Sequence, residues 1–158
     1  MFYVLLALFS GAIVLADQIT KYLTVTNIPL YGEVPFLPGF LCFTYTQNTG
    51  AAFSALEGQQ WLFALLFVVL TLLIAYQIWK KPLPFTKANW WCIAAIYGGG
   101  LGNMIDRVRL GYVVDMIQTQ FIRFPVFNVA DCFVTCGCIL LAVQILLFDR
   151  EVWKEELK

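Results

Sequence analysis

The feature that most constrains this chain is a long run, Trp61 to Trp79, that contains no charged side chain. Tryptophan stands at each end of the run, where aromatic rings favour the membrane–water interface, and Lys80-Lys81 follows directly. A run of this length and composition predicts a helix that crosses a lipid bilayer. The whole chain agrees with this prediction, because 61% of its 158 residues are hydrophobic and 13% are charged.

Three other apolar segments predict three more membrane-spanning helices. We expect one membrane-embedded domain, residues 1–158, with approximate spans at 2–24, 60–79, 89–106 and 126–148. The first segment has no basic residue before it and no small-residue cleavage pattern after it. We therefore expect it to be a retained helix and not a secretory signal.

Two segments between the predicted helices favour short strands. Prolines and glycines interrupt residues 28–56, within which Leu41, Phe43 and Tyr45 alternate with the period of a strand, and residues 111–117 also look extended. The expected fold class is therefore mainly α, an integral membrane protein with four transmembrane helices and a small sheet outside the bilayer.

The order of the spans predicts where the polar residues lie. Four spans place both termini on one side of the membrane, and the lysines at 80, 81 and 87 make that side the cytoplasm. The polar residues near the other ends of the spans then meet at the outer face. These residues are Asp17, Lys21, Asn48, Asn103, Asp106, Arg107, Asp115 and Asp131.

The composition excludes several kinds of chemistry. With no histidine in the chain, serine–histidine–acid triads and histidine-ligated metal sites are impossible. The five cysteines have no further soft ligands beside them, so we expect no metal and no cofactor. Ten basic and ten acidic residues balance without a basic tract, which argues against nucleic-acid binding.

The outer aspartates predict acid–base chemistry. Asp17 has Lys21 one helical turn away, and Asp106 stands beside Arg107, with which we expect it to form an ion pair. Asp115 and Asp131 have no neighbouring base in the sequence. Two carboxyl groups brought close together share one proton, as in aspartic proteases, so we predict that these two form a catalytic pair.

Several motifs also have a purely structural interpretation. The Asp17–Lys21 pair fits an ion pair at a helix end, with the lysine reaching the lipid headgroups, or the support of a nearby site. Asn48-Thr49-Gly50 fits a turn between strand and helix, or a substrate contact. The glycines between Gly98 and Gly102 favour close helix packing, and they also leave room for a substrate backbone.

Five short motifs follow one another along the chain: Asp17-Gln18-x-x-Lys21, Asn48-x-Gly50-x-x-Phe53, Gly99-x-x-Gly102-Asn103-x-x-Asp106-Arg107, Val113-Val114-Asp115 and Phe127-Asn128-x-Ala130-Asp131. In this order they resemble the motifs of the lipoprotein signal peptidases, the type II signal peptidases of bacterial membranes. Departures from the usual pattern are Gly100, Met116 and Cys132, and none of them removes a polar group. We therefore expect them to affect substrate preference and not activity.

The resemblance implies an aspartic endopeptidase that cuts prolipoproteins before their diacylglyceryl-modified cysteine. Its implied location is the cytoplasmic membrane of a bacterium, with the active site near the outer face and the strands forming a β-cradle. We expect phospholipid around it and a monomeric chain. By motif position, Asp115 and Asp131 are the catalytic dyad, and the residues that bind substrate or support the site are Asn48, Gly50, Asn103, Arg107, Asn128, Asp17, Lys21 and Asp106.

Three other functions are compatible with some of these residues. A small proton- or ion-coupled transporter could use the same acids, although we find no repeat between the two halves of the chain. A serine peptidase could activate Ser54 with Lys21, but nothing in the sequence brings the two together. A non-catalytic membrane scaffold is the third.

Overall fold

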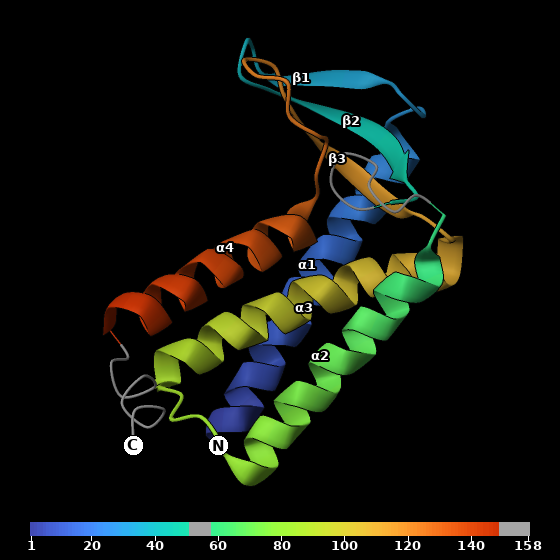
Figure 1. The fold of residues 1–158 in the computed structure, drawn as a ribbon. Coiled ribbons are helices and arrows are strands. Elements are labelled where there is room, and N and C mark those ends of the chain that lie inside the picture. Colours follow the sequence, from blue (N-terminus) through green and yellow to red (C-terminus); the bar gives the residue numbers. More distant parts are fainter. Residues whose placement is uncertain (51–57, 149–158) are drawn as a thin grey trace.

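The computed structural model describes residues 1–50 and 58–148; Phe53 and Ser54, named above, lie outside these ranges. The chain folds into four long helices, and a small sheet lies at one end of the bundle (Figure 1). The elements are α1 Phe2–Asn27, β1 Glu33–Leu37, β2 Leu41–Asn48, α2 Gln60–Lys80, α3 Lys87–Leu110, β3 Val113–Thr119, α4 Val129–Val143 and a final π-helical turn, Gln144–Phe148.

The four helices agree with the predicted spans, with small differences at their ends. By length and composition, α1, α2 and the continuous helix Val129–Phe148 could each cross a membrane. Helix α3 is less apolar because its asparagines, glycines and terminal charges lower its hydropathy. Its 24 residues still span about 36 Å, more than the hydrocarbon core of a bilayer.

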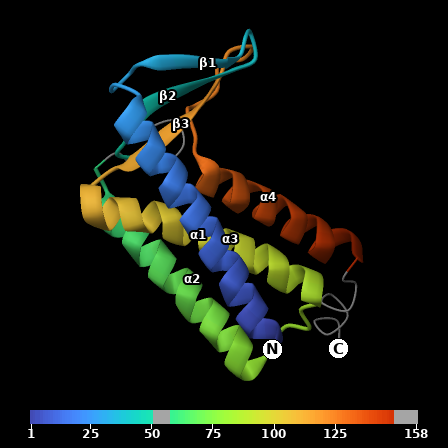
Figure 2. The same ribbon diagram turned by 180° about the vertical axis from the view of Figure 1, so that it is seen from behind.

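Helix α3 lies at the centre of the bundle. It packs most extensively against α4 and α1, and less against α2. Figure 2 shows α1 crossing α3 on the side opposite to the one that faces the viewer in Figure 1. The ends of α1 and α3 and the beginnings of α2 and α4 all lie toward the sheet, so residues from every helix can meet there.

The glycines of α3 allow its close contact with the neighbouring helices. A Cβ atom on Gly98 would lie 2.9 Å from the Ser10 carbonyl oxygen of α1. One on Gly99 would lie 2.5 Å from the Ala130 carbonyl oxygen of α4, and one on Gly102 would lie 2.6 Å from a carboxylate oxygen of Asp17. The predicted close helix packing is therefore confirmed.

Replacing Gly99 by alanine is expected to destabilise the protein by about 1–3 kcal/mol, because the backbone of α4 must move to accept the methyl group. Thermal unfolding in detergent measures this loss. Gly11→Ala is the matched control, since a Cβ atom at Gly11 in α1 meets nothing within 4 Å. An unfolding temperature for Gly99→Ala equal to that of Gly11→Ala would contradict the packing argument.

The three strands form one antiparallel sheet in the order β1-β2-β3. The predicted strand at 41–45 is present, but of Leu41, Phe43 and Tyr45 only Tyr45 is buried. The reason is a bulge: β2 advances from Phe43 to Thr46 while β3 moves only from Ile117 to Asp115. The bulge places Asp115 opposite Thr46, toward the helices.

Candidate active site

A buried charge cluster connects α1 and α3 beneath the sheet. The Lys21 ammonium lies 2.9 Å from Asp17 and 3.0 Å from Asp106, and these three side chains are at most 4% exposed. The predicted contact between Asp17 and Lys21 is confirmed. The alternative in which Lys21 reaches the lipid headgroups is wrong, because its ammonium group is enclosed by the two carboxylates.

The predicted ion pair between Asp106 and Arg107 is also wrong. Consecutive residues on a helix point in different directions, so the two side chains do not face each other. Asp106 turns toward Lys21. Arg107 instead donates to the carbonyl oxygens of Gly50, at 3.0 Å, and Asn103, at 3.4 Å, with its guanidinium 4.3 Å from the centre of the Phe63 ring.

The buried cluster also holds the backbone just before each of the two remaining aspartates. A carboxylate oxygen of Asp106 accepts the Val114 N–H at 3.1 Å, and one of Asp17 accepts the Ala130 N–H at 3.0 Å. Val114 immediately precedes Asp115, and Ala130 immediately precedes Asp131. The cluster therefore positions the two chain segments that bring these carboxyl groups together.

Asp115 lies on β3 and accepts two amide hydrogen bonds. Its Oδ2 accepts from the Asn48 side chain at 2.9 Å and its Oδ1 from the Asn128 side chain at 2.7 Å. Asn48 also accepts the Gly50 N–H at 2.9 Å. The predicted turn at Asn48 is therefore confirmed, and its amide also contacts a site residue, while the substrate contact stays a prediction.

Asp131 lies in the first turn of α4. Its Oδ1 accepts from the Asn103 side chain at 2.7 Å and its Oδ2 from the Asn128 N–H at 3.1 Å. The Asn128 Oδ1 accepts the Asp131 N–H in return, which completes a capping box. Through its side chain and its backbone, Asn128 thus contacts both carboxyl groups.

The surroundings of the two carboxyl groups differ. Burial raises the pKa of Asp115 to about 7; the negative charge of Asp131 acts in the same direction, and the hydrogen bonds from Asn48 and Asn128 oppose it. Asp131 receives two N–H donors at the N-terminus of a helix, where the helix dipole favours a negative charge. The burial of Asp115 therefore favours a proton on that carboxyl group.

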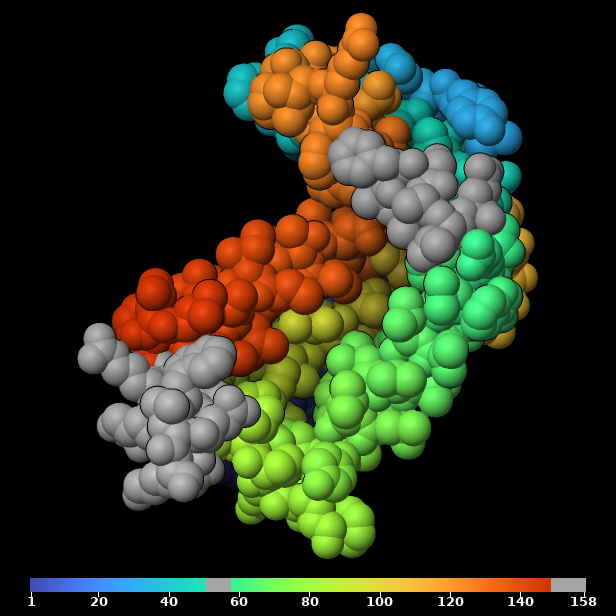
Figure 3. All heavy atoms as spheres, in the orientation of Figure 1, coloured from blue at the N-terminus to red at the C-terminus, as the bar shows by residue number. Residues whose placement is uncertain are grey.

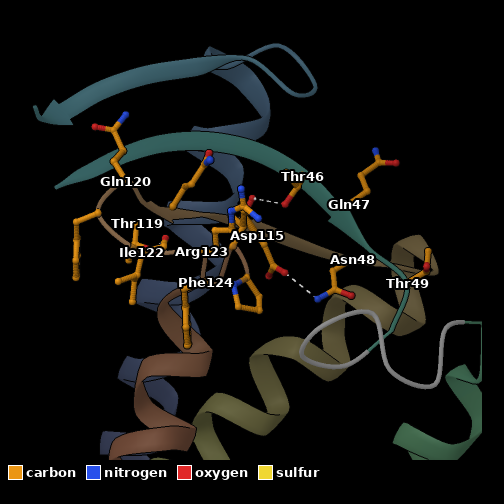
Figure 4. A pocket seen from close by; sticks show the side chains of 14 residues that line it. Thr46, Gln47, Asn48, Thr49, Asp115, Thr119, Gln120, Ile122, Arg123 and Phe124 are labelled. Carbon is orange, nitrogen blue, oxygen red and sulfur yellow. Dashed lines mark hydrogen bonds between the residues drawn. The ribbon is translucent and has the colours of Figure 1, made fainter. Parts of the chain in front are cut away.

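Two cavities meet at these residues. The smaller, with a volume of about 410 Å³, is lined by both aspartates and extends along α4 past Cys132, Val134 and Cys136. The larger, about 1070 Å³, lies between the sheet and the loop before α4. Figure 3 shows a deep hollow between the overhanging sheet and α4, and Figure 4 shows Asp115 in the wall of the larger cavity.

The chain matches a known protein family. The family model described as signal peptidase (SPase) II matches residues 9–147. The chain belongs to the signal peptidase II family. Among curated relatives, the lipoprotein signal peptidase of Enterococcus faecalis (strain ATCC 700802 / V583) is 44% identical over 150 residues, which cover 94% of this chain and 91% of the relative. The lipoprotein signal peptidase of Streptococcus pyogenes serotype M5 (strain Manfredo) is 45% identical over 148 residues, which cover 91% of this chain and 90% of the relative.

Solved structures agree with this family assignment. Two structures of a bacterial membrane enzyme, obtained by the in meso method, superpose with TM-scores of 0.83 and 0.80 at 33% and 34% identity. The first match covers 89% of this chain and 87% of that structure, and the second covers 90% and 93%. The chain is thus a membrane protease with the fold of these two membrane enzymes, and family membership favours this function over the transporter.

Every site residue predicted from the sequence lies in the site or in the charge cluster behind it. One further residue, Gln18 of the first motif, was given no role in the sequence analysis: its amide donates to Asp106 at 2.9 Å and to the Gly102 carbonyl oxygen at 3.2 Å. Its position next to Asp17 in an apolar helix is the signal that could have revealed it. Among residues 1–50 and 58–148, no group of three or more acidic, histidine or cysteine side chains is arranged to bind a metal ion.

Proposed function

We propose that this chain is an aspartic endopeptidase that removes the signal peptide from diacylglyceryl-modified prolipoproteins, with Asp115 and Asp131 as its catalytic dyad. The observation that carries the proposal is the position of Asn128, which donates from its side chain to one carboxyl group and from its backbone to the other. Both acids line one cavity, as a reaction that uses the two together requires.

The two acids would divide the work by their protonation. The ionised Asp131 takes a proton from a water molecule, and the oxygen of that water attacks the carbonyl carbon of the residue before the lipidated cysteine. The protonated Asp115 donates a hydrogen bond to the carbonyl oxygen and then transfers its proton there. When the tetrahedral intermediate collapses, the C–N bond breaks, Asp131 passes its proton to the leaving amine, and Asp115 recovers its own.

The other residues would orient these groups and the substrate. Asn48, Asn103 and Asn128 donate to the carboxyl groups and so fix their positions. The Arg107 guanidinium lies at the cavity wall and donates to the Gly50 carbonyl oxygen, which holds Gly50 beside the site. The buried cluster of Asp17, Lys21 and Asp106 has a structural role.

The proposed setting is a bacterial cytoplasmic membrane, with the active site at the outer face and both termini in the cytoplasm. We propose that the chain is a single domain of residues 1–158 and acts as a monomer surrounded by phospholipid. Lys80 ends α2 and Lys87 begins α3, at the end of the bundle remote from the sheet. The positive-inside rule assigns that end to the cytoplasm and the sheet to the outside. Acyl chains on the substrate cysteine can then stay in the bilayer while the bond to be cut reaches the dyad.

The direct test is cleavage of a diacylglyceryl prolipoprotein by the purified protein in phospholipid vesicles. We expect a single cut immediately before the lipidated cysteine, identified by mass spectrometry. The same precursor without the diacylglyceryl group is the control and should be cut much more slowly. If the wild-type protein leaves the lipidated precursor intact, the proposed function is wrong.

Activity is expected to fall as the pH rises above about 7. Because burial raises the pKa of Asp115 to about 7, the proton that the mechanism requires is present below this pH and is lost above it. A plot of log(kcat/KM) against pH should therefore decline with a slope approaching −1 on the alkaline side. A constant kcat/KM between pH 6 and 9 would contradict the protonated state assigned to Asp115.

A further inference from the structure

The larger cavity has no role in the proposed chemistry, although it opens onto the same carboxyl group. It shares Asn48 and Asp115 with the apolar cavity, while Asp131 lines the apolar cavity. Apart from Asp115, the wall near the sheet is formed mainly by neutral polar side chains such as Thr46, Gln47 and Gln118, whereas residues 121–126 of the loop contribute mainly apolar ones, so this cavity is more polar than the other. Two cavities of different polarity thus meet at one acid.

A prolipoprotein has two chemically different parts on either side of the bond that is cut. The signal peptide and the acyl chains are apolar and suit the cavity along α4. The chain after the cysteine leads out of the membrane into water, and it suits a polar groove under the sheet. At about 1070 Å³, this groove exceeds the roughly 300–1,000 Å³ of small-molecule sites, which is consistent with a peptide segment.

Arg123 gives this groove a charge. Among the described residues that line it, the charged ones are Asp115, at the end shared with the apolar cavity, and Arg123, on the loop between β3 and α4. Arg123 is exposed and forms no ion pair within residues 1–50 and 58–148. Figure 4 shows its side chain among those that line the groove. Its guanidinium is therefore available to a bound chain.

We propose that the groove between the sheet and the loop before α4 binds the residues that follow the lipidated cysteine, and that Arg123 makes the enzyme prefer acidic residues there over basic ones. This inference rests on the proposed function, because it assigns a binding site to one part of the proposed substrate. An exposed guanidinium attracts a nearby carboxylate and repels an ammonium group, and both effects weaken as salt is added.

The test compares two diacylglyceryl peptides that are identical except for two aspartates or two lysines directly after the lipidated cysteine. Neutral phosphatidylcholine vesicles are used so that the lipid surface adds no charge preference. For the wild-type enzyme at low salt, we expect kcat/KM for the aspartate peptide to exceed that for the lysine peptide by about tenfold. The difference should shrink in 0.5 M NaCl.

Three variants separate a charge effect from a structural one. Arg123→Gln should bring the ratio of the two kcat/KM values close to one, and Arg123→Glu should reverse the preference. Arg109→Gln is the matched control, because Arg109 is an exposed arginine at the end of α3 that does not line the groove. It should keep the wild-type ratio.

The outcomes separate this inference from the proposed function. If Arg123→Gln retains the wild-type ratio, or slows both peptides equally, the inference is wrong even though cleavage before the cysteine continues. Equal cleavage of both peptides by the wild-type enzyme would also overturn it. If the wild-type enzyme cuts neither peptide, the proposed function itself fails.

Discussion

Replacing either Asp115 or Asp131 by asparagine is expected to lower kcat by about a thousandfold or more, because each acid carries a proton transfer that its amide cannot perform. The two single variants should be about equally inactive, since the proposed reaction needs one protonated and one ionised carboxyl group. Cleavage of a diacylglyceryl prolipoprotein, followed by mass spectrometry, measures the loss.

The control for this prediction is Glu33→Gln, which makes the same chemical change at an exposed position on β1. It should retain wild-type activity. The side-chain amides of Asn48 and Asn128 each donate to one carboxyl oxygen of Asp115. In Asp115→Asn, one of these donors meets an NH2 group that cannot accept, so thermal unfolding is used to check that the variant is folded. Wild-type turnover in either folded variant would exclude that residue from the dyad.

Replacing Lys21 by methionine is expected to destabilise the protein by about 3–5 kcal/mol, because the change leaves two buried carboxylates without their cation. Activity should fall as well. Asp106 and Asp17 hold the backbone N–H groups just before Asp115 and Asp131, so movement of the cluster displaces both acids. Thermal unfolding in detergent and the cleavage assay report the two effects.

A second substitution separates the charge effect from the loss of the lysine stem. Adding Asp106→Asn to Lys21→Met removes one of the unpaired charges, so the double variant should unfold at a higher temperature than Lys21→Met alone. Lys87→Met is the control, because Lys87 is exposed at the start of α3 and should change stability by less than about 0.5 kcal/mol. Equal stability of Lys21→Met and Lys87→Met would refute the structural role of the cluster.

Much of the site could be predicted because its signals are local. Asp17 and Lys21 are one helical turn apart, so their contact follows from helix geometry. The capping box joins Asn128 to Asp131 over three residues and positions one acid at the beginning of α4. The elimination that left Asp115 and Asp131 used neighbours in the sequence, although one step of that reasoning, the pairing of Asp106 with Arg107, was wrong.

The sequence by itself determined the four helices and their order, because apolar segments of this length must satisfy their backbone hydrogen bonds internally within a bilayer. Which side chains meet was decided by the tertiary structure. Lys21 lies between Asp17 and Asp106 because the glycines of α3 let α1 approach closely. Asn128 contacts Asp115 because the bulge in β2 sets the register of β3. Lys21 and Asp106 lie on different helices, and Asp115 and Asn128 are 13 residues apart and belong to different elements. Local sequence patterns do not predict contacts between separate elements.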